Sequence, residues 1–182
     1  MSIVEIFCRQ VRARSAEHKL AIAATRSIPG QMVSILRQEL DSLVRIVFLL
    51  SQVDRVHRSR LIEDSVAGRR WRRPNSSHSV TDREMVELTD TLHGWTKSVY
   101  DFGCAFIHLS NFHDHRVRDP LLQIPADERR SILEHLRYYH GGPNDSSTVF
   151  SDIVPFLPMV FEKIASNLEC YLKNLEQDGD IN

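Results

Sequence analysis

The sequence predicts an all-α protein: an antiparallel helical bundle of four to five main helices, two of them long. The chain has 182 residues, 42% of them hydrophobic, which is enough to bury the core of one domain. Seven glycines and seven prolines are too few for the many turns of a sandwich or barrel. Apolar residues recur at steps of three and four, as on one helix face. We expect one domain over residues 1–176 and a flexible acidic tail over 177–182.

The first two expected helices fill most of residues 2–67. Near-helical apolar spacing predicts a helix over residues 2–28, before the proline-glycine pair at 29–30 interrupts the pattern. A long second helix is expected over residues 31–67, with Gly68 as its stop. Its apolar stripe consists of Leu36, Leu40, Leu43, Val47 and Leu50.

An arginine-rich segment separates the second expected helix from the third. Residues 68–80 place arginines around Trp71, followed by proline and small polar residues, which predicts a basic loop. Thr81 and Glu84 have the spacing of a capping box, so a long helix should begin there and run to about His115. Its seam consists of Met85, Leu88, Leu92, Trp95, Val99, Phe102, Phe106 and Leu109.

Proline and glycine bound the last two expected helices. Pro125 suits the first turn of a fourth core helix, and the glycine pair at 141–142 ends it. Residues 141–150 should form a loop. The final helix should begin near residues 151–152 and accommodate the prolines at 155 and 158 in or near its first turns. One side of it carries Leu157, Phe161, Ile164, Leu168 and Leu175.

The net charge of −1 conceals two oppositely charged halves. Residues 1–73 hold fourteen Lys or Arg against seven Asp or Glu, whereas residues 74–182 hold nine against seventeen. Nineteen of the 23 basic residues are arginine, which suits bidentate contacts to carboxylate or phosphate. Two explanations stay open: the halves pair with each other, within the fold or across a dimer, or the first half binds phosphate.

Cysteine usage and hydropathy indicate a cytoplasmic chain. Cys8, Cys104 and Cys170 are odd in number, far apart and without CxxC spacing, as in a reduced protein. The first residues lack the long apolar core of a signal peptide, and no apolar run reaches membrane-spanning length. We therefore expect no membrane partner.

The basic focus of the chain is a candidate nucleic-acid surface. Arginine with an interleaved tryptophan suits single-stranded RNA or DNA, through phosphate contacts and base stacking. The alternative is a basic loop that packs against the acidic second half. The candidate binding residues are Arg55, Arg58, Arg69, Arg70, Trp71, Arg72 and Arg73.

A polar stripe should lie beside the aromatic seam of the third helix. Its members are His93, Lys97, Asp101, Cys104, His108, Asn111 and His115. Cys104, His108 and His115 could supply a thiolate nucleophile or zinc ligands. Against this, Cys104 is typical of a small core residue, and no HExxH or CxxC cluster completes a coordination sphere. We expect no cofactor, and a metal-dependent enzyme on this stripe stays a further alternative.

The window Ser110-Asn111 followed by His115, set in a helical bundle, resembles the HEPN superfamily. These small helical domains include many metal-independent ribonucleases of defence and toxin systems, and also inactive adaptors. Their signature is an arginine, a polar residue and then a histidine; here Ser110 replaces the arginine. The resemblance implies that arginine holds phosphate, that histidine moves a proton, and that two copies meet in a homodimer.

Two other pairs match the spacing of that signature literally. They are Arg12 with His18 on the first expected helix, and Arg130 with His135 on the fourth. A solvated helix face explains either pair as well.

The first interpretation is therefore a cytoplasmic, bacterial-type, homodimeric HEPN-like protein that binds RNA or another phosphate-rich partner. As a ribonuclease it would use Asn111, His115 and His108, with Arg45 as phosphate ligand, because an arginine inside an apolar seam needs a partner. The alternative is a non-catalytic dimeric interaction or adaptor protein, whose seams and polar stripe set partner choice.

Overall fold

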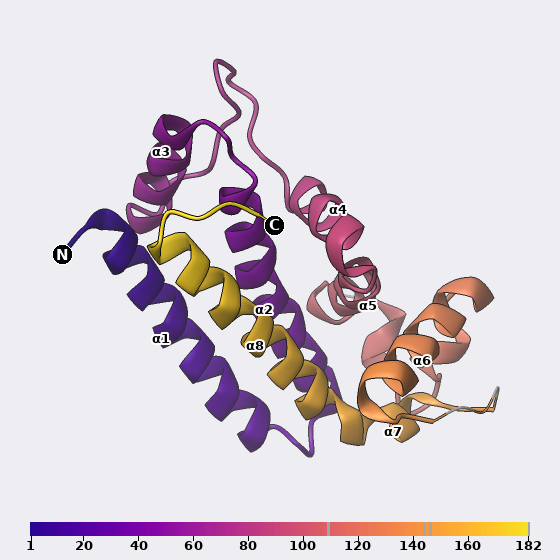
Figure 1. Ribbon diagram of the computed structural model, residues 1–182. Helices are drawn as coiled ribbons and strands as arrows, with labels where there is room; N and C mark the ends of the chain where they lie inside the picture. The colour runs from indigo at the N-terminus through magenta and orange to yellow at the C-terminus, as the bar shows by residue number, and fades with distance from the viewer. Residues whose placement is uncertain (109, 144, 146, 182) are drawn as a thin grey trace.

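The computed structural model describes residues 1–108, 110–143, 145 and 147–181, and their regular structure is helical, which confirms the expected all-α class; the long helices are three and not the expected two. Three long helices lie side by side: α1 (Ile3–Ala24), α2 (Pro29–Leu50) and α8 (Leu157–Glu176). Helix α1 runs antiparallel to the other two (Figure 1). Helix α2 is central, because it packs against α1, α4, α5 and α8 and most of its residues are buried.

Shorter elements surround this layer. In chain order they are α3 (Arg55–Val66), α4 (Asp82–His93), α5 (Thr96–Ile107), the 3-10 turns η1 (Asn111–Asp114) and η2 (Pro120–Leu122), α6 (Ala126–His140), α7 (Phe150–Ile153) and the 3-10 turn η3 (Val154–Phe156). Helices α4 and α5 pack on α2, and α6 lies beside α5 and α8 (Figure 1).

The expected single helix over residues 31–67 is wrong, because the chain breaks between α2 and α3. The Ser51 hydroxyl and the Gln52 amide both donate to the carbonyl of Phe48, and these local bonds compete with continued helix. Asp54 then caps α3 by accepting from the backbone of the next turn. Gly68, with φ of 68°, follows the end of α3 as expected.

The expected helix over residues 81–115 is also two helices. The capping box of Thr81 and Glu84 is confirmed, but Gly94 adopts a left-handed conformation with φ of 69° and ends α4. Helix α5 ends at Ile107, so the expected seam is not continuous. Leu92 is exposed, whereas most of its aromatic members are buried; Leu109 lies outside the described residues.

The bounds of α6 agree with the sequence, whereas α1 ends four residues before the expected residue 28 and the last expected helix is divided into α7, η3 and α8. Helix α6 follows Pro125 and ends at Gly141, which is left-handed with φ of 65°. The two prolines of the last segment lie in η3 and at the start of α8, where no helical donor is lost. The pair at 29–30 starts α2, since proline suits the first helical turn.

Residues 178–180 of the acidic tail contact α3. Arg58 donates to the carbonyl of Gly179 at 2.8 Å and to the carboxylate of Asp180 at 2.9 Å. Arg55 lies 2.9 Å from the same carboxylate. This contact cannot be predicted from composition, because the arginines and aspartates that form it are more than a hundred residues apart in the chain.

No helix in the described ranges is both long and apolar enough to cross a membrane.

Candidate functional site

Trp71, expected to stack on bases, belongs to the core. Its ring is only 4% exposed and stacks on Phe48 with 5.8 Å between the ring centroids. Its indole N–H donates to the Ser65 hydroxyl at 2.8 Å, and the Arg45 guanidinium lies 5.3 Å from its ring. The ring is therefore covered by this chain, and the expectation that it binds bases is corrected.

Arg58 is likewise engaged inside the protein. It is 3% exposed and, besides the tail, donates to the carbonyls of Leu50 and Gln52 at 3.0 and 3.1 Å. Those carbonyls end α2, so Arg58 caps that helix. Arg58 is thus a structural residue and not a phosphate ligand on an open surface, and Arg55 beside it is paired with the same tail.

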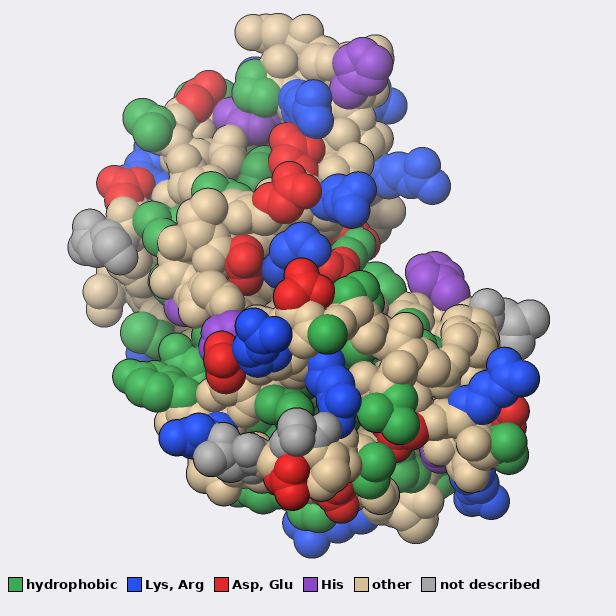
Figure 2. All heavy atoms as spheres, turned by 90° about the vertical axis from the view of Figure 1, so that its right-hand side faces the viewer, with side chains coloured by type: hydrophobic (Ala, Val, Ile, Leu, Met, Phe, Trp, Pro, Cys, Tyr) green, Lys and Arg blue, Asp and Glu red, His purple; other side chains and the backbone are tan. Residues whose placement is uncertain are grey.

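The arginines of the basic loop divide into paired and unpaired ones. Arg69 pairs with Asp64 at 2.7 Å, and Arg73 pairs with Glu84 at 2.9 Å. Arg70 and Arg72 are exposed, and no ion pair to either is found among the described residues. On the face that Figure 2 shows, basic and acidic side chains are interspersed.

Most ion pairs join the basic first half to the acidic second half. Arg12 contacts Glu169 at 2.9 Å and Glu176 at 2.6 Å, which ties α1 to α8. Arg45 contacts Asp82 at 3.1 Å, which ties α2 to α4. The expectation that the halves pair within the fold is confirmed.

The four expected catalytic residues do not converge within one chain. His115 lies at the N-terminal end of α2, with its Nε2 atom 4.0 Å from the point where a Cβ on Gly30 would lie. Arg45 is fifteen residues further along α2, about 22 Å at the rise of an α-helix. His108 and Asn111 are exposed, and the amide of Asn111 bonds to Gln123. Arg45 is therefore not the phosphate partner of His115.

The polar stripe is divided by the break at Gly94 and by the end of α5. Cys104 is half-buried beside Arg37, whose guanidinium lies over the Tyr100 ring at 4.0 Å. All three cysteines are free thiols. Groups of three or more metal-ligating side chains are absent from the described part of the chain, so the Cys104, His108 and His115 metal site is not assembled there.

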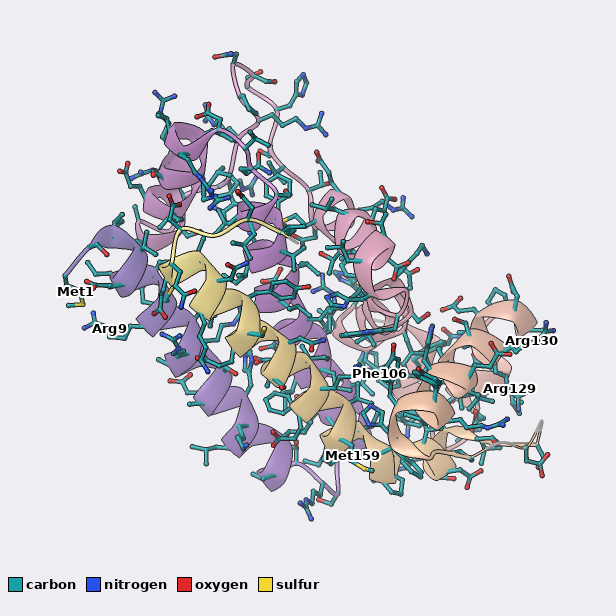
Figure 3. The ribbon with its side chains drawn as sticks, in the orientation of Figure 1. Met1, Arg9, Phe106, Arg129, Arg130 and Met159 are labelled. Carbon is teal, nitrogen blue, oxygen red and sulfur yellow. The ribbon has the colours of Figure 1, made fainter. Side chains whose placement is uncertain are left out.

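The literal matches to the HEPN spacing are separated by their contacts. Arg12 is held by two glutamates, while the His18 Nδ1 atom lies 2.7 Å from the carboxylate of Glu39, which also accepts from the Ser15 hydroxyl. Glu39 is fully buried, so this cluster pins α1 to α2. Arg130 lies on the outer side of α6 and points away from the rest of the protein (Figure 3).

His115 contributes to an open hollow, here called the His115 hollow, of about 590 Å³. It is lined by Ser27, Pro29, His115, Arg116, Asp119 and Phe150, among others. The His115 ring is half-buried and stands edge-on to Phe150 at 5.7 Å. The Asp119 carboxylate accepts from the backbone of Leu121 and Phe150 at 2.9 and 2.7 Å, so it is occupied by the fold.

A second hollow is apolar and lies between α2, α5, α6 and α8. This cavity, here called the Lys163 cavity, has a volume of about 80 Å³. Its wall includes Leu36, Val99, Phe102, Ile132, Leu136 and Leu157. The ionisable side chains that border it are those of Lys163, His135 and His140. Figure 3 shows Phe106, the neighbour of this wall on α5, between the central helices and α6.

Lys163 is held at this cavity by aromatic rings. Its ammonium lies 3.7 Å from the centroid of the Tyr139 ring and 5.8 Å from that of Trp95, within the range of cation–π attraction. Burial lowers the pKa of Lys163 below its usual range. Within the described ranges no carboxylate pairs with this ammonium.

Histidines next to Lys163 are biased toward their neutral form. Burial and then the charge of Lys163 lower the pKa of His140. The same two causes lower the pKa of His93, whose Nε2 atom lies 3.2 Å from the Tyr171 hydroxyl. Neutral imidazoles both donate and accept hydrogen bonds. An apolar cavity, one cation and neutral imidazoles together suit a small amphipathic molecule.

Sequence reasoning missed this site. The sequence predicts Trp95 as a member of the apolar seam, and it singles out neither Tyr139 nor Lys163. The available signal was a lone lysine within the apolar stretch of residues 157–168. That signal is weak, because lysine commonly extends its ammonium from an apolar helix into water.

No family model matches the chain, and no curated protein or solved structure does so either. The functional inference therefore depends on the geometry of the Lys163 cavity and the His115 hollow.

Proposed function

We propose that this protein binds a small, mainly apolar molecule in the Lys163 cavity. The observation that carries the proposal is the cavity itself, which side chains from α2, α5, α6, α7 and α8 line with aliphatic and aromatic groups. Such concave apolar sites with a few polar groups are typical of small-molecule binding. Small-molecule binding is not among the functions that the sequence suggested.

The apolar wall of the cavity supplies a driving force for binding. The cavity is partly open, so a ligand that enters it removes apolar wall from water and gains packing contacts. The volume is about half that of the dry 150 Å³ cavity that accepts benzene, so about three or four carbon atoms fit inside.

Xenon and 1-butanol test the proposal, because both enter apolar cavities without needing a charged partner. Methyl signals of Val99 and Leu136, which line the cavity, should shift in two-dimensional NMR spectra as either probe is added. Methyl signals of Leu43 and Leu61, which are buried but do not line it, should stay in place. Equal shifts at all four positions, or no shifts, would overturn the proposal.

A variant that fills the cavity provides a second measurement. Val99→Leu adds a methylene toward the cavity, whereas Val117→Leu makes the same change at a position that is 78% exposed. Val99→Leu should weaken 1-butanol binding and Val117→Leu should leave it unchanged. Circular dichroism of both variants checks that the fold is retained.

A second candidate function is the metal-independent RNA cleavage that the resemblance to HEPN domains implies. The observation that favours it is that His115 and Arg116 line one open hollow. Histidine could move a proton while an arginine holds phosphate. Ser110, which replaces the signature arginine, donates to the carbonyl of Ala105 and accepts from the backbone of Phe112. Arg116 is therefore the phosphate ligand that this candidate requires.

Cleavage of a labelled single-stranded RNA in the presence of EDTA tests the second candidate. His115→Ala should abolish cleavage, and the matched change His113→Ala should not, because His113 is exposed and its ring contacts the carbonyl of His108 instead of lining the hollow. Undiminished cleavage by His115→Ala, or none by the wild type, would contradict it. Light scattering would show whether an active form is dimeric.

A further inference from the structure

We infer that the natural ligand of the Lys163 cavity is a short-chain monocarboxylate whose carboxylate pairs with the Lys163 ammonium. This inference rests on the proposed binding function and names the chemical class of the ligand. It depends on where the cation lies, on what surrounds it and on the room beside it.

The cation is positioned at the border of the apolar cavity. Lys163 lies on α8 and is itself part of the cavity lining. The rings of Tyr139 on α6 and Trp95 at the start of α5 hold its ammonium from two other elements, at 3.7 and 5.8 Å from their centroids. Three parts of the chain thus converge on one charged group beside an apolar space.

That ammonium has no counter-ion among the residues that the structure describes. Its neighbour in sequence, Glu162, pairs with Lys19 at 2.9 Å. By contrast, Arg12, Arg58 and Lys97 each contact at least one carboxylate. A partly desolvated cation is stabilised by an anion that approaches it, and the cavity is the space from which a ligand can do so.

The neighbouring imidazoles complete a site for one carboxylate. His135 and His140 border the same cavity as Lys163. Because its pKa is lowered, the imidazole of His140 can donate one hydrogen bond to a carboxylate oxygen without adding a second positive charge. One ammonium and one neutral donor match the single charge of a carboxylate, whereas phosphate groups are typically bound by arginine forks or several cations.

The apolar part of the ligand follows from the size of the cavity. About 80 Å³ accepts about three or four carbon atoms beyond the carboxylate, as in butanoate or pentanoate. The structure therefore assigns both ends of the ligand: an anion at Lys163 and a short hydrocarbon chain against the wall.

Titration calorimetry with matched probes tests this inference. The probes are pentanoate, 1-pentanol and butyl phosphate, which carry unbranched alkyl chains of about four, five and four carbon atoms and differ in the polar group. Wild-type protein should bind pentanoate about tenfold more tightly than 1-pentanol, the ratio expected from one charge-assisted contact. Butyl phosphate should bind no more tightly than pentanoate.

Two lysine variants on α8 locate the effect. Lys163→Met keeps a stem of similar length and removes the charge, so it should abolish the preference for pentanoate while 1-pentanol still binds within about twofold of the wild type. Lys173→Met removes an exposed charge from the same helix and should leave the preference unchanged.

The outcomes separate the two proposals. Equal binding of pentanoate and 1-pentanol by the wild type would overturn the carboxylate inference while supporting an apolar site. Binding of neither probe would overturn the proposed function as well. A preference that persists in Lys163→Met, or that disappears in Lys173→Met, would show that Lys163 is not the anchor, and tighter binding of butyl phosphate would replace carboxylate by phosphate.

Discussion

Replacing Arg58 by methionine should lower the free energy of unfolding by about 3 kcal/mol. The guanidinium of Arg58 donates to the carbonyls of Leu50 and Gln52, which have no further helical partner at the end of α2. A buried acceptor that loses its donor costs about 1.5 kcal/mol, within the known range. Methionine leaves the buried carbonyl of Leu50 and the partly buried carbonyl of Gln52 in that state, and it also removes the contacts to the tail. The apolar stem is largely retained, so lost packing contributes little.

The tail contacts of Arg58 should contribute less than its contacts to α2. The side chains of Asp178 and Asp180 are 75% and 59% exposed, and water and salt weaken exposed ion pairs to less than about 1 kcal/mol. The double change Asp178→Asn with Asp180→Asn should therefore cost about 1 kcal/mol or less.

Urea unfolding followed by circular dichroism measures both effects at equilibrium. A loss of less than about 1 kcal/mol in Arg58→Met would refute the assignment of Arg58 as a cap of α2. A loss in the double aspartate variant that equals that of Arg58→Met would refute the division between backbone and tail contacts. The slopes of the transitions should be equal, because both variants keep the same core.

Three further predictions concern packing and pH. Glu39→Gln should destabilise the fold by about 2 kcal/mol, because the buried carboxylate that holds His18 is lost; thermal unfolding measures it. Gly103→Ala should cost about 2 kcal/mol in urea unfolding, because its Cβ would lie 2.7 Å from the Cβ of Arg37 and force α2 and α5 apart; an unchanged midpoint would contradict this contact. The pKa of His140 is lowered in the folded protein, so the unfolded chain binds more protons below about pH 6.5, and stability should fall as the pH drops through this region. In Lys163→Met, which removes the positive charge next to His140, the free energy of unfolding should fall less as the pH drops.

The basic segment of residues 55–73 serves the fold, whereas the sequence alone suggests a nucleic-acid surface there. The arginines around residues 55–73 resemble a nucleic-acid surface when they are read along the chain. In the fold, Arg58 caps a helix, Trp71 fills the core, and Arg69 and Arg73 pair with carboxylates. Arg70 and Arg72 are the members of this set that stay exposed without an ion pair in the described ranges. Most of these arginines are therefore neutralised by partners within the fold.

Local signals predicted the elements that local interactions decide. The capping box at Thr81, the start of α6 after Pro125 and its end at Gly141 were correct, because each depends on backbone geometry within a few residues. The breaks near Ser51 and at Gly94 were missed. Apolar spacing continued across both, and periodicity does not show that hydroxyl, amide and left-handed glycine conformations end a helix there.

The sequence by itself determined the helical class and the unequal charge of the two halves. It also determined which apolar residues of most helices face the core. Only the tertiary structure decided which charges meet, because an ion pair depends on distances across the fold and not along the chain. It separated Arg45 from His115 by most of the length of α2. It also brought Lys163, Tyr139 and Trp95 from three separate segments to one apolar cavity. Burial there, and the lack of a carboxylate partner within the part of the chain that the structure describes, make Lys163 a candidate binding group.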